Sequence, residues 1–276
     1  MKLVIDSAYR PRRVYGVDFS GAKKAGNKIW IAFATIIDEA LIVEDCYQAK
    51  NLPGSSVERD QCLDALQNFI STQKECAFGL DFPFGLPVSL IQDNTWEEFI
   101  LSFSNHYSDP GVFRNICWIA AGHSERKRNT DQVNKTPFSP YNRRLYRQTY
   151  YGIRNVLAPL VRNRLVSVSP MQEGLKGKPW LFEVCPASTL KKMDLYFVPY
   201  KGAGQETRAS RLRILEGIKK TGFLLIQTPV LESKILGDSN GDALDSVIAA
   251  FATFRNLVRS SCLENAEDML EGHVYA

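Results

Sequence analysis

Two short apolar stretches that each end in an aspartate constrain this chain most. The first runs from Val14 to Asp18 and leads into a turn that contains a glycine. The second runs from Cys76 to Asp81 and leads into a Phe-Pro pair. A carboxylate at the tip of a buried strand is costly unless a cation or hydrogen-bond donors meet it. The fold must therefore supply a partner for each aspartate.

The segment between these aspartates predicts how the two strands are connected. Residues Lys28 to Ile37 and Ala40 to Gln48 are β-rich runs around a turn, which is typical of a hairpin. Residues Val57 to Thr72 carry apolar side chains at helical spacing. A helical crossover predicts that the strand ending at Asp81 lies parallel to the first, with a right-handed connection. Both carboxylates would then emerge at one sheet edge, where open α/β sheets bind ligands.

The second half of the chain predicts further strands and helices of the same α/β class. We expect a strand over Trp180 to Cys185 with Glu183 inside it, a helix over Glu206 to Lys219, a short strand over Phe223 to Gln227, and a helix over Asp242 to Leu257. The last helix is strongly apolar and should be mostly buried. Its first turn places Asp242 and Asp245 on one face. The acidic tail from Glu264 is expected to be solvated.

Residues from about 86 to 179 form a long insertion that is basic. From Asn105 to Trp180 the chain has 13 lysine and arginine residues against 4 aspartate and glutamate residues, although its overall net charge is only +4. Residues Gly122 to Pro137 are polar and are expected to form a mobile loop. A helix is expected from Ser139-Pro140 to about Leu157, because proline is favoured in a first turn.

This uneven charge favours a polyanion as partner, although a solvated basic face is the alternative. Guanidinium groups pair with phosphates in a fixed geometry, and tyrosines such as Tyr146, Tyr150 and Tyr151 can stack on unpaired bases. The candidate nucleic-acid-binding residues are Arg126, Lys127, Arg128, Arg143, Arg144, Arg147 and Arg154 in the insertion, and Arg208 and Arg211 in the later helix.

Several classes of protein are poorly supported. The six cysteines include no Cys-x-x-Cys pair, and there is no His-Glu-x-x-His or Gly-x-Ser-x-Gly motif, so a zinc site, a disulfide framework and a serine triad are not indicated. No run of 18 apolar residues exists, and the N-terminus does not resemble a signal peptide. We therefore expect a cytoplasmic protein with no membrane partner.

The acidic residues at the strand and helix ends predict a metal site. If the late helix packs on the sheet, Asp18, Asp81, Asp242 and Asp245 converge, with Glu183 as a further candidate catalytic residue. Carboxylates a few ångströms apart repel one another and raise at least one pKa strongly. Hard divalent ions relieve this repulsion, and Mg²⁺ or Mn²⁺ held by carboxylates is the predicted cofactor.

The order of these elements resembles the ribonuclease H fold, with a mixed sheet flanked by helices. Four blocks, GVDFSGA (16 to 22), GLDFPFGLP (79 to 87), FEVCPAS (182 to 188) and DALDSVIAAF (242 to 251), resemble the predicted nucleases of domain-of-unknown-function family 429. The resemblance covers most of the chain as one domain over residues 1 to 276. It implies a nuclease site at the five carboxylates named above. Members of that family often have histidine before the proline of the third block, where Cys185 stands here.

Together these features predict a nuclease that hydrolyses phosphodiester bonds of DNA or RNA by a two-metal mechanism, with Asp18 bridging the ions. Two alternatives remain open. One is an actin-like or sugar-kinase-like ATPase, because the first strand of those folds also ends in an aspartate before a glycine turn. The other is a nucleic-acid-binding protein that keeps the fold without catalysis.

Overall fold

The protein is organised around one mixed β-sheet. A computed structural model describes residues 11–259 and 268–276. In these ranges eight strands form one sheet in the order β5-β6-β4-β1-β2-β3-β7, with β8 pairing with β6. The strands are β1 Arg13–Asp18, β2 Trp30–Ile37, β3 Ala40–Gln48, β4 Cys76–Leu80, β5 Ser167–Ser169, β6 Trp180–Val184, β7 Leu224–Ile226 and β8 Val274–Tyr275.

The strand pairing is that of the ribonuclease H fold. Strand β2 is antiparallel to both β1 and β3, whereas β4 is parallel to β1 and β6 is parallel to β4. The predicted hairpin and the predicted parallel pairing of the first and fourth strands are both confirmed. The carboxyl ends of β1 and β4 therefore lie at the same sheet edge, as the helical crossover requires.

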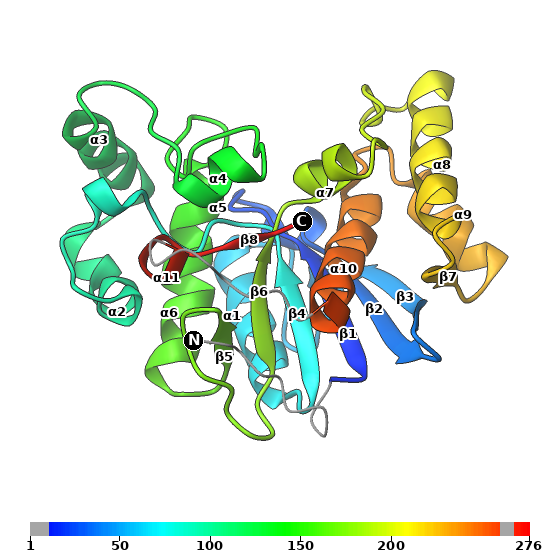
Figure 1. The fold of residues 1–276 in the computed structure, drawn as a ribbon, viewed down its shortest axis with the longest axis horizontal. Coiled ribbons are helices and arrows are strands. Elements are labelled where there is room, and N and C mark those ends of the chain that lie inside the picture. The colour runs from blue at the N-terminus through cyan, green and yellow to red at the C-terminus, as the bar shows by residue number, and fades with distance from the viewer. Residues whose placement is uncertain (1–10, 260–267) are drawn as a thin grey trace.

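Helices cover both faces of the sheet because residues alternate between the faces along each strand. In β1, Tyr15 and Val17 belong to one apolar cluster, whereas Val14 belongs to the other. Helix α1, Arg59–Thr72, packs in the first cluster, and α10, Asp242–Arg259, packs in the second. Figure 1 shows these two helices on opposite faces of the sheet. The remaining helices of the second face are α7 Pro186–Lys192, α8 Gln205–Lys219 and α9 Pro229–Gly237.

Two glycines let α10 lie directly against the sheet. Gly16 of β1 and Gly79 of β4 are register partners. A Cβ at Gly16 would lie 2.0 Å from the backbone oxygen of Ser246, and one at Gly79 would lie 2.0 Å from Oγ1 of Thr253. Because any side chain at these positions would push α10 away, the glycines fix the helix close to β1 and β4.

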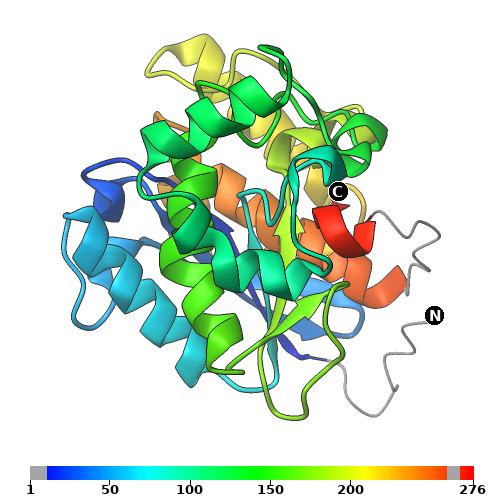
Figure 2. The same ribbon diagram turned by 90° about the vertical axis from the view of Figure 1, so that its left-hand side faces the viewer.

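The insertion forms most of the helical layer on the first face. Its helices are α2 Trp96–His106, α3 Pro110–Ala120, α4 Asn129–Val133, α5 Tyr146–Tyr151 and α6 Ala158–Arg162, and a π-helical segment, Gly152–Leu157, joins the last two. Figure 2 shows the green helices of this segment lying over the sheet. The insertion also contains strand β5, which pairs with β6 and so extends the sheet.

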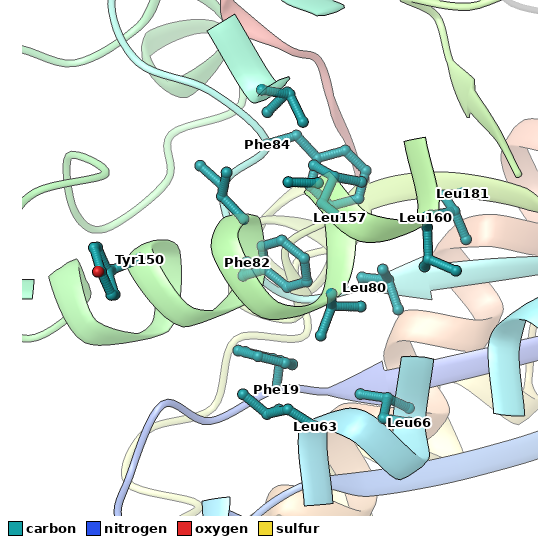
Figure 3. Packing of buried hydrophobic residues seen from close by; sticks show 14 of the residues in the cluster. Phe19, Leu63, Leu66, Leu80, Phe82, Phe84, Tyr150, Leu157, Leu160 and Leu181 are labelled. Carbon is teal, nitrogen blue, oxygen red and sulfur yellow. The ribbon is translucent and has the colours of Figure 1, made fainter. Parts of the chain in front are cut away.

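The helix predicted from Pro140 to Leu157 differs from the structure at both ends. It begins at Tyr146 and continues as one helical rod through Pro159 to Arg162. Pro159 lies directly after the π-helical segment, where the regular hydrogen-bond pattern of an α-helix already changes. A Cβ at Gly152 would lie 2.5 Å from the ring of Phe82, so this glycine lets the rod pack on the turn after β4. Figure 3 shows Phe82 beneath this helix, with Phe19 and Leu80 nearby.

Two sequence expectations for irregular segments are wrong. Residues Gly122 to Pro137 are not a mobile loop, because they contain α4 and two side chains that are almost fully buried, Arg128 and Asp131. The tail is not a solvated end in its described part, residues 268–276, where α11, Asp268–Glu271, precedes β8. Glu271 is 4% exposed, and its carboxylate accepts hydrogen bonds from the backbone of Val88 and Asn129. Residues 264–267 of that tail lie outside the described ranges.

No helix in the described ranges is long and apolar enough to cross a membrane.

Candidate carboxylate site

The predicted acidic residues are placed by the ends of three elements. Asp18 is the last residue of β1, and Asp81 directly follows β4, where its backbone N–H donates to the Val17 carbonyl at 3.0 Å. Asp242 and Asp245 lie in the first turn of α10. The two glycines of the sheet hold that turn against the strand ends. Asp18 and Asp245 are 8% and 3% exposed, so burial removes both from most of their hydration.

A lysine that the sequence analysis did not single out provides the cation of this cluster. The Nζ atom of Lys201 lies 2.6 Å from Oδ2 of Asp245 and 3.7 Å from Oδ1 of Asp242. The hydroxyl of Tyr200 also donates to Asp245, at 3.0 Å from Oδ1. The Lys201 side chain is 49% exposed, so its ammonium reaches the buried carboxylates from the solvent side.

Burial and mutual repulsion perturb the acidity of the cluster. Desolvation, together with the charge of Asp245, raises the pKa of Asp18 well above its usual range. The same two causes raise the pKa of Asp81 to about 8. Burial also raises the pKa of Asp245, although Lys201 and Tyr200 oppose that shift. Burial alone would lower the pKa of Lys201, but Asp245 and Asp18 raise it above its usual value. The three aspartates are thus electrostatically coupled and short of positive charge.

The donor chemistry of the cluster suits a hard divalent ion, but the geometry is not that of a preformed cage. Carboxylate oxygens are the ligands that Mg²⁺ and Mn²⁺ prefer. Within residues 11–259 and 268–276, however, no three His, Cys, Asp or Glu side chains are disposed to hold one metal ion. Instead, Asp245 and Asp242 are paired with the Lys201 ammonium. A divalent ion would therefore have to compete with this lysine for the same oxygens.

Glu183 is next to this cluster but is paired with an arginine. It is 2% exposed, and its carboxylate accepts from both terminal nitrogens of Arg128 and from the backbone N–H of Phe84. Burial raises the pKa of Glu183, and Arg128 opposes that shift. Arg128 also donates to both oxygens of Asp131 at 2.9 Å. The structure therefore gives Glu183 a structural ion pair rather than a free carboxylate.

Two arginines predicted to bind nucleic acid are buried. Arg128 is 1% exposed, and the pairing with Asp131 and Glu183 makes it unavailable to a phosphate. Arg211 is 2% exposed and donates to the backbone carbonyls of Tyr200 and Leu236. Arg211 thereby holds the loop that carries Lys201. No sequence motif marks either role, because the partners are distant along the chain.

The other predicted basic residues remain accessible. Lys127 is half-buried, and the exposed ones are Arg126, Arg143, Arg144, Arg147, Arg154 and Arg208. The tyrosines predicted to stack on bases are less available: Tyr150 is fully buried, and Arg59 lies 3.7 Å over the ring of Tyr151.

An open cleft leads to the carboxylates. Its volume is about 600 Å³, and it is lined by Asp18, Asp81, Asp242 and Lys201 together with Lys28 and Gln148. The α5 region borders the turn after Asp18, because a Cβ at Gly21 would lie 2.4 Å from the Arg147 backbone oxygen. The cleft is therefore acidic at its base and has basic residues at its margin.

Comparison with known proteins adds one structural likeness. No sequence model of a known protein family matches the chain, and no curated protein matches it. Among solved structures, the yeast mitochondrial Holliday junction resolvase Ydc2 is similar, with 11% identity and a TM-score of 0.40 over 94% of this chain and 86% of that chain. Membership of family 429 stays a prediction. The strand order and pairing define an α/β protein of ribonuclease H-like topology.

Proposed function

We propose that this protein is a divalent-metal-dependent nuclease that hydrolyses phosphodiester bonds. The observation that supports this most is the meeting of Asp18, Asp81 and Asp245 at one sheet edge, where burial raises all three pKa values and the charge of Asp245 adds to the shifts of Asp18 and Asp81. Such an arrangement costs stability unless positive charge is supplied. Buried carboxylates that destabilise the fold in this way are candidates for a functional role rather than a structural one.

Asp18, Asp81 and Asp245 would hold the metal, with Asp242 at the margin. A bound Mg²⁺ or Mn²⁺ would supply positive charge that stabilises the transition state of phosphodiester hydrolysis, and would lower the pKa of the attacking water. The residues of the chain prepare this site. The aspartates must be deprotonated, and the Lys201 ammonium must leave Asp245. Because Lys201 is half-exposed, it can turn toward solvent and pair there with a phosphate oxygen of the substrate.

The basic residues at the cleft support a nucleic-acid strand as substrate. Lys28 lines the cleft beside Asp18 and Asp242, and exposed Arg143 and Arg147 lie along the neighbouring α5 region. Contacts of this kind to the phosphate backbone fix the position of a strand without reading its sequence. Binding should weaken steeply as salt is added, because each phosphate contact releases counterions.

The test is cleavage of labelled DNA and RNA oligonucleotides with Mn²⁺ or Mg²⁺. We expect metal-dependent products from the native chain and a rate at least ~100-fold lower for Asp18→Asn, because that residue is central to the cluster. Asp64→Asn is the matched control, since Asp64 is exposed on α1 away from the cleft. Full activity in Asp18→Asn, with melting curves that show both variants folded, would contradict the proposal.

A second candidate is a non-catalytic nucleic-acid-binding protein. The observation that favours it is the Lys201 ion pair, which neutralises part of the cluster without metal. Retarded migration of an oligonucleotide in a gel, with no product across several metals, would support this candidate. Stabilisation by ATP but not by Mn²⁺ would instead favour the kinase-like alternative.

A further inference from the structure

We propose that a second cavity beside the carboxylates receives one unpaired nucleobase of the bound strand. This inference rests on the proposed function and specifies its substrate. The cavity has a volume of about 270 Å³ and lies between the turn after β4, α7 and the segment before α5. It is more enclosed than the open cleft, and it shares Asp81, Asp245 and Lys201 with the proposed metal site.

The cavity adjoins the cleft at the site of chemistry. Asp81, Gln148 and Lys201 line both the cleft and the cavity. If a phosphate of the strand lies at these residues, the base of the same nucleotide can therefore reach the cavity. The Gln148 side chain is fixed in position, because its amide nitrogen donates to the Asp81 carbonyl. The boundary between the two spaces is thus defined by residues that are held in place.

The walls of the cavity have the chemistry of a base-stacking site. They include the rings of Phe138, Tyr196 and Tyr200 and the prolines Pro83 and Pro186. Aromatic and proline surfaces stack on the faces of bases with little dependence on sequence. Burial holds Tyr200 in place at 6% exposure, whereas Phe138 is partly exposed. One flat ligand could lie against these walls without opening the core.

The charged lining favours a nucleotide over an apolar molecule. The Arg144 guanidinium lies 5.5 Å from the centroid of the Phe138 ring and also lines the cavity. Arginine in this position can stack on a base and pair with its phosphate. The buried charges farther inside are already paired, Arg128 with both Asp131 and Glu183, and Asp245 with Lys201. They leave the inner end polar, which suits the hydrogen-bonding edge of a base.

The size of the cavity selects the state of the strand. About 270 Å³ is enough for one base, and a base can reach an enclosed pocket of this kind only when it is out of the helical stack. A base in a duplex would have to leave its partner before it entered, and this costs unstacking and unpairing energy that a single strand does not pay. The expected substrates are therefore single strands, or duplexes with unpaired nucleotides at a branch, bulge or end.

The test compares a short single-stranded oligonucleotide with a sugar-phosphate strand of the same length that lacks all bases. Affinities are measured by fluorescence anisotropy in the Asp18→Asn background, so that cleavage does not interfere. The strand with bases should bind about tenfold more tightly, because stacking adds to the phosphate contacts. Ala187→Phe, which fills the cavity from the first turn of α7, should abolish this difference. Phe138→Ala should reduce it, and Ala120→Phe on distant α3 should leave it unchanged.

Equal affinity for the two strands in the Asp18→Asn background would overturn the inference while leaving nucleic-acid binding intact. Full discrimination retained by both Ala187→Phe and Phe138→Ala, with unchanged melting curves, would also overturn it. Failure to bind either strand would count against the proposed function as well. If Ala187→Phe does not fold, Phe138→Ala decides the result, since its side chain is partly exposed and its loss removes only one wall.

Discussion

The Nζ atom of Lys201 lies 2.6 Å from Oδ2 of Asp245, the most buried carboxylate of the cluster. Lys201 thus supplies one positive charge to the cluster, which leaves the three aspartates with an excess of negative charge. The loop that carries it is held from behind by Arg211, which donates to the Tyr200 and Gly202 carbonyls at 2.7 and 3.0 Å. A lysine in this position makes the cluster tolerable in the folded protein, and it competes with any metal for the same oxygens.

Replacement of this lysine should therefore strengthen metal binding. We expect Lys201→Met to raise Mn²⁺ affinity at least about tenfold, because the competing charge is gone while the ligands remain. The metal-free variant should melt at a lower temperature than the native protein, since its buried carboxylates have lost their cation. Calorimetric titration and melting curves measure both effects. Lys220→Met, an exposed position on the end of α8, is the control and should change neither. Unchanged Mn²⁺ affinity in Lys201→Met would show that the lysine does not occupy the metal position.

The raised pKa of Asp81 predicts a dependence of stability on pH. Burial first, and the charge of Asp245 second, raise the pKa of Asp81 to about 8 in the folded protein, against about 3.9 when unfolded. Between these values the folded state binds more protons than the unfolded state, so the free energy of unfolding falls as pH rises. The Tm of the metal-free protein should drop by several degrees between about pH 5 and pH 8. Asp81→Asn should make this fall shallower but not remove it, because the pKa values of Asp18 and Asp245 are also raised. Saturating Mn²⁺ should reverse the profile, because metal requires the ionised carboxylate. A Tm that rises over the same interval would contradict the assigned shift.

The Arg128 network predicts a large effect on stability. Arg128→Met leaves the carboxylates of Asp131 and Glu183 buried without their main cation. We expect the free energy of unfolding to fall by about 3–5 kcal/mol, as measured by urea denaturation. Arg126→Met, two residues earlier and exposed, should change it by less than about 0.5 kcal/mol. If Arg128→Met lowered the free energy of unfolding by no more than Arg126→Met does, the ion pair of Arg128 with Glu183 would not stabilise the fold.

The contact of α10 with the sheet predicts that Gly16 cannot be replaced. The methyl group of Gly16→Ala would lie 2.0 Å from the Ser246 oxygen and 2.2 Å from the Ala250 nitrogen, both in the backbone of α10. Helix α10 must shift, and we expect a loss of at least ~1–3 kcal/mol together with weaker Mn²⁺ binding, since Asp245 moves with the helix. Gly237→Ala is the control, because no atom lies within 4 Å of its Cβ position. Normal Mn²⁺ affinity in a folded Gly16→Ala protein would show that the position of the carboxylates does not depend on this packing.

The elements that position the aspartates could be predicted from the sequence because their signals are local. Alternating apolar residues indicated the hairpin, and helical spacing indicated α1 and α10, whose observed starts lie within two residues of the predicted ones. The parallel pairing of β1 and β4 followed from the crossover rule alone. Strand β8 was missed because it has only two residues and pairs with β6 far away in the sequence.

The partners of the charged residues could not be predicted in this way. Arg128 looked like part of a basic loop, and its burial depends on Asp131 nearby and on Glu183, 55 positions later. Lys201 stands in a loop where nothing distinguishes it from other lysines, and it meets Asp245 only because α10 packs on the sheet. Pairings of this kind are set by tertiary structure, whereas sequence periodicity reports only which face of an element is apolar.

The most direct test of the central claim is a crystal structure with Mn²⁺, in which anomalous scattering locates the ion. We predict a strong anomalous peak bounded by Asp18, Asp81 and Asp245, with the Lys201 ammonium moved out of contact with Asp245. No Mn²⁺ at these residues, with Lys201 still paired to Asp245 at saturating metal, would contradict the account.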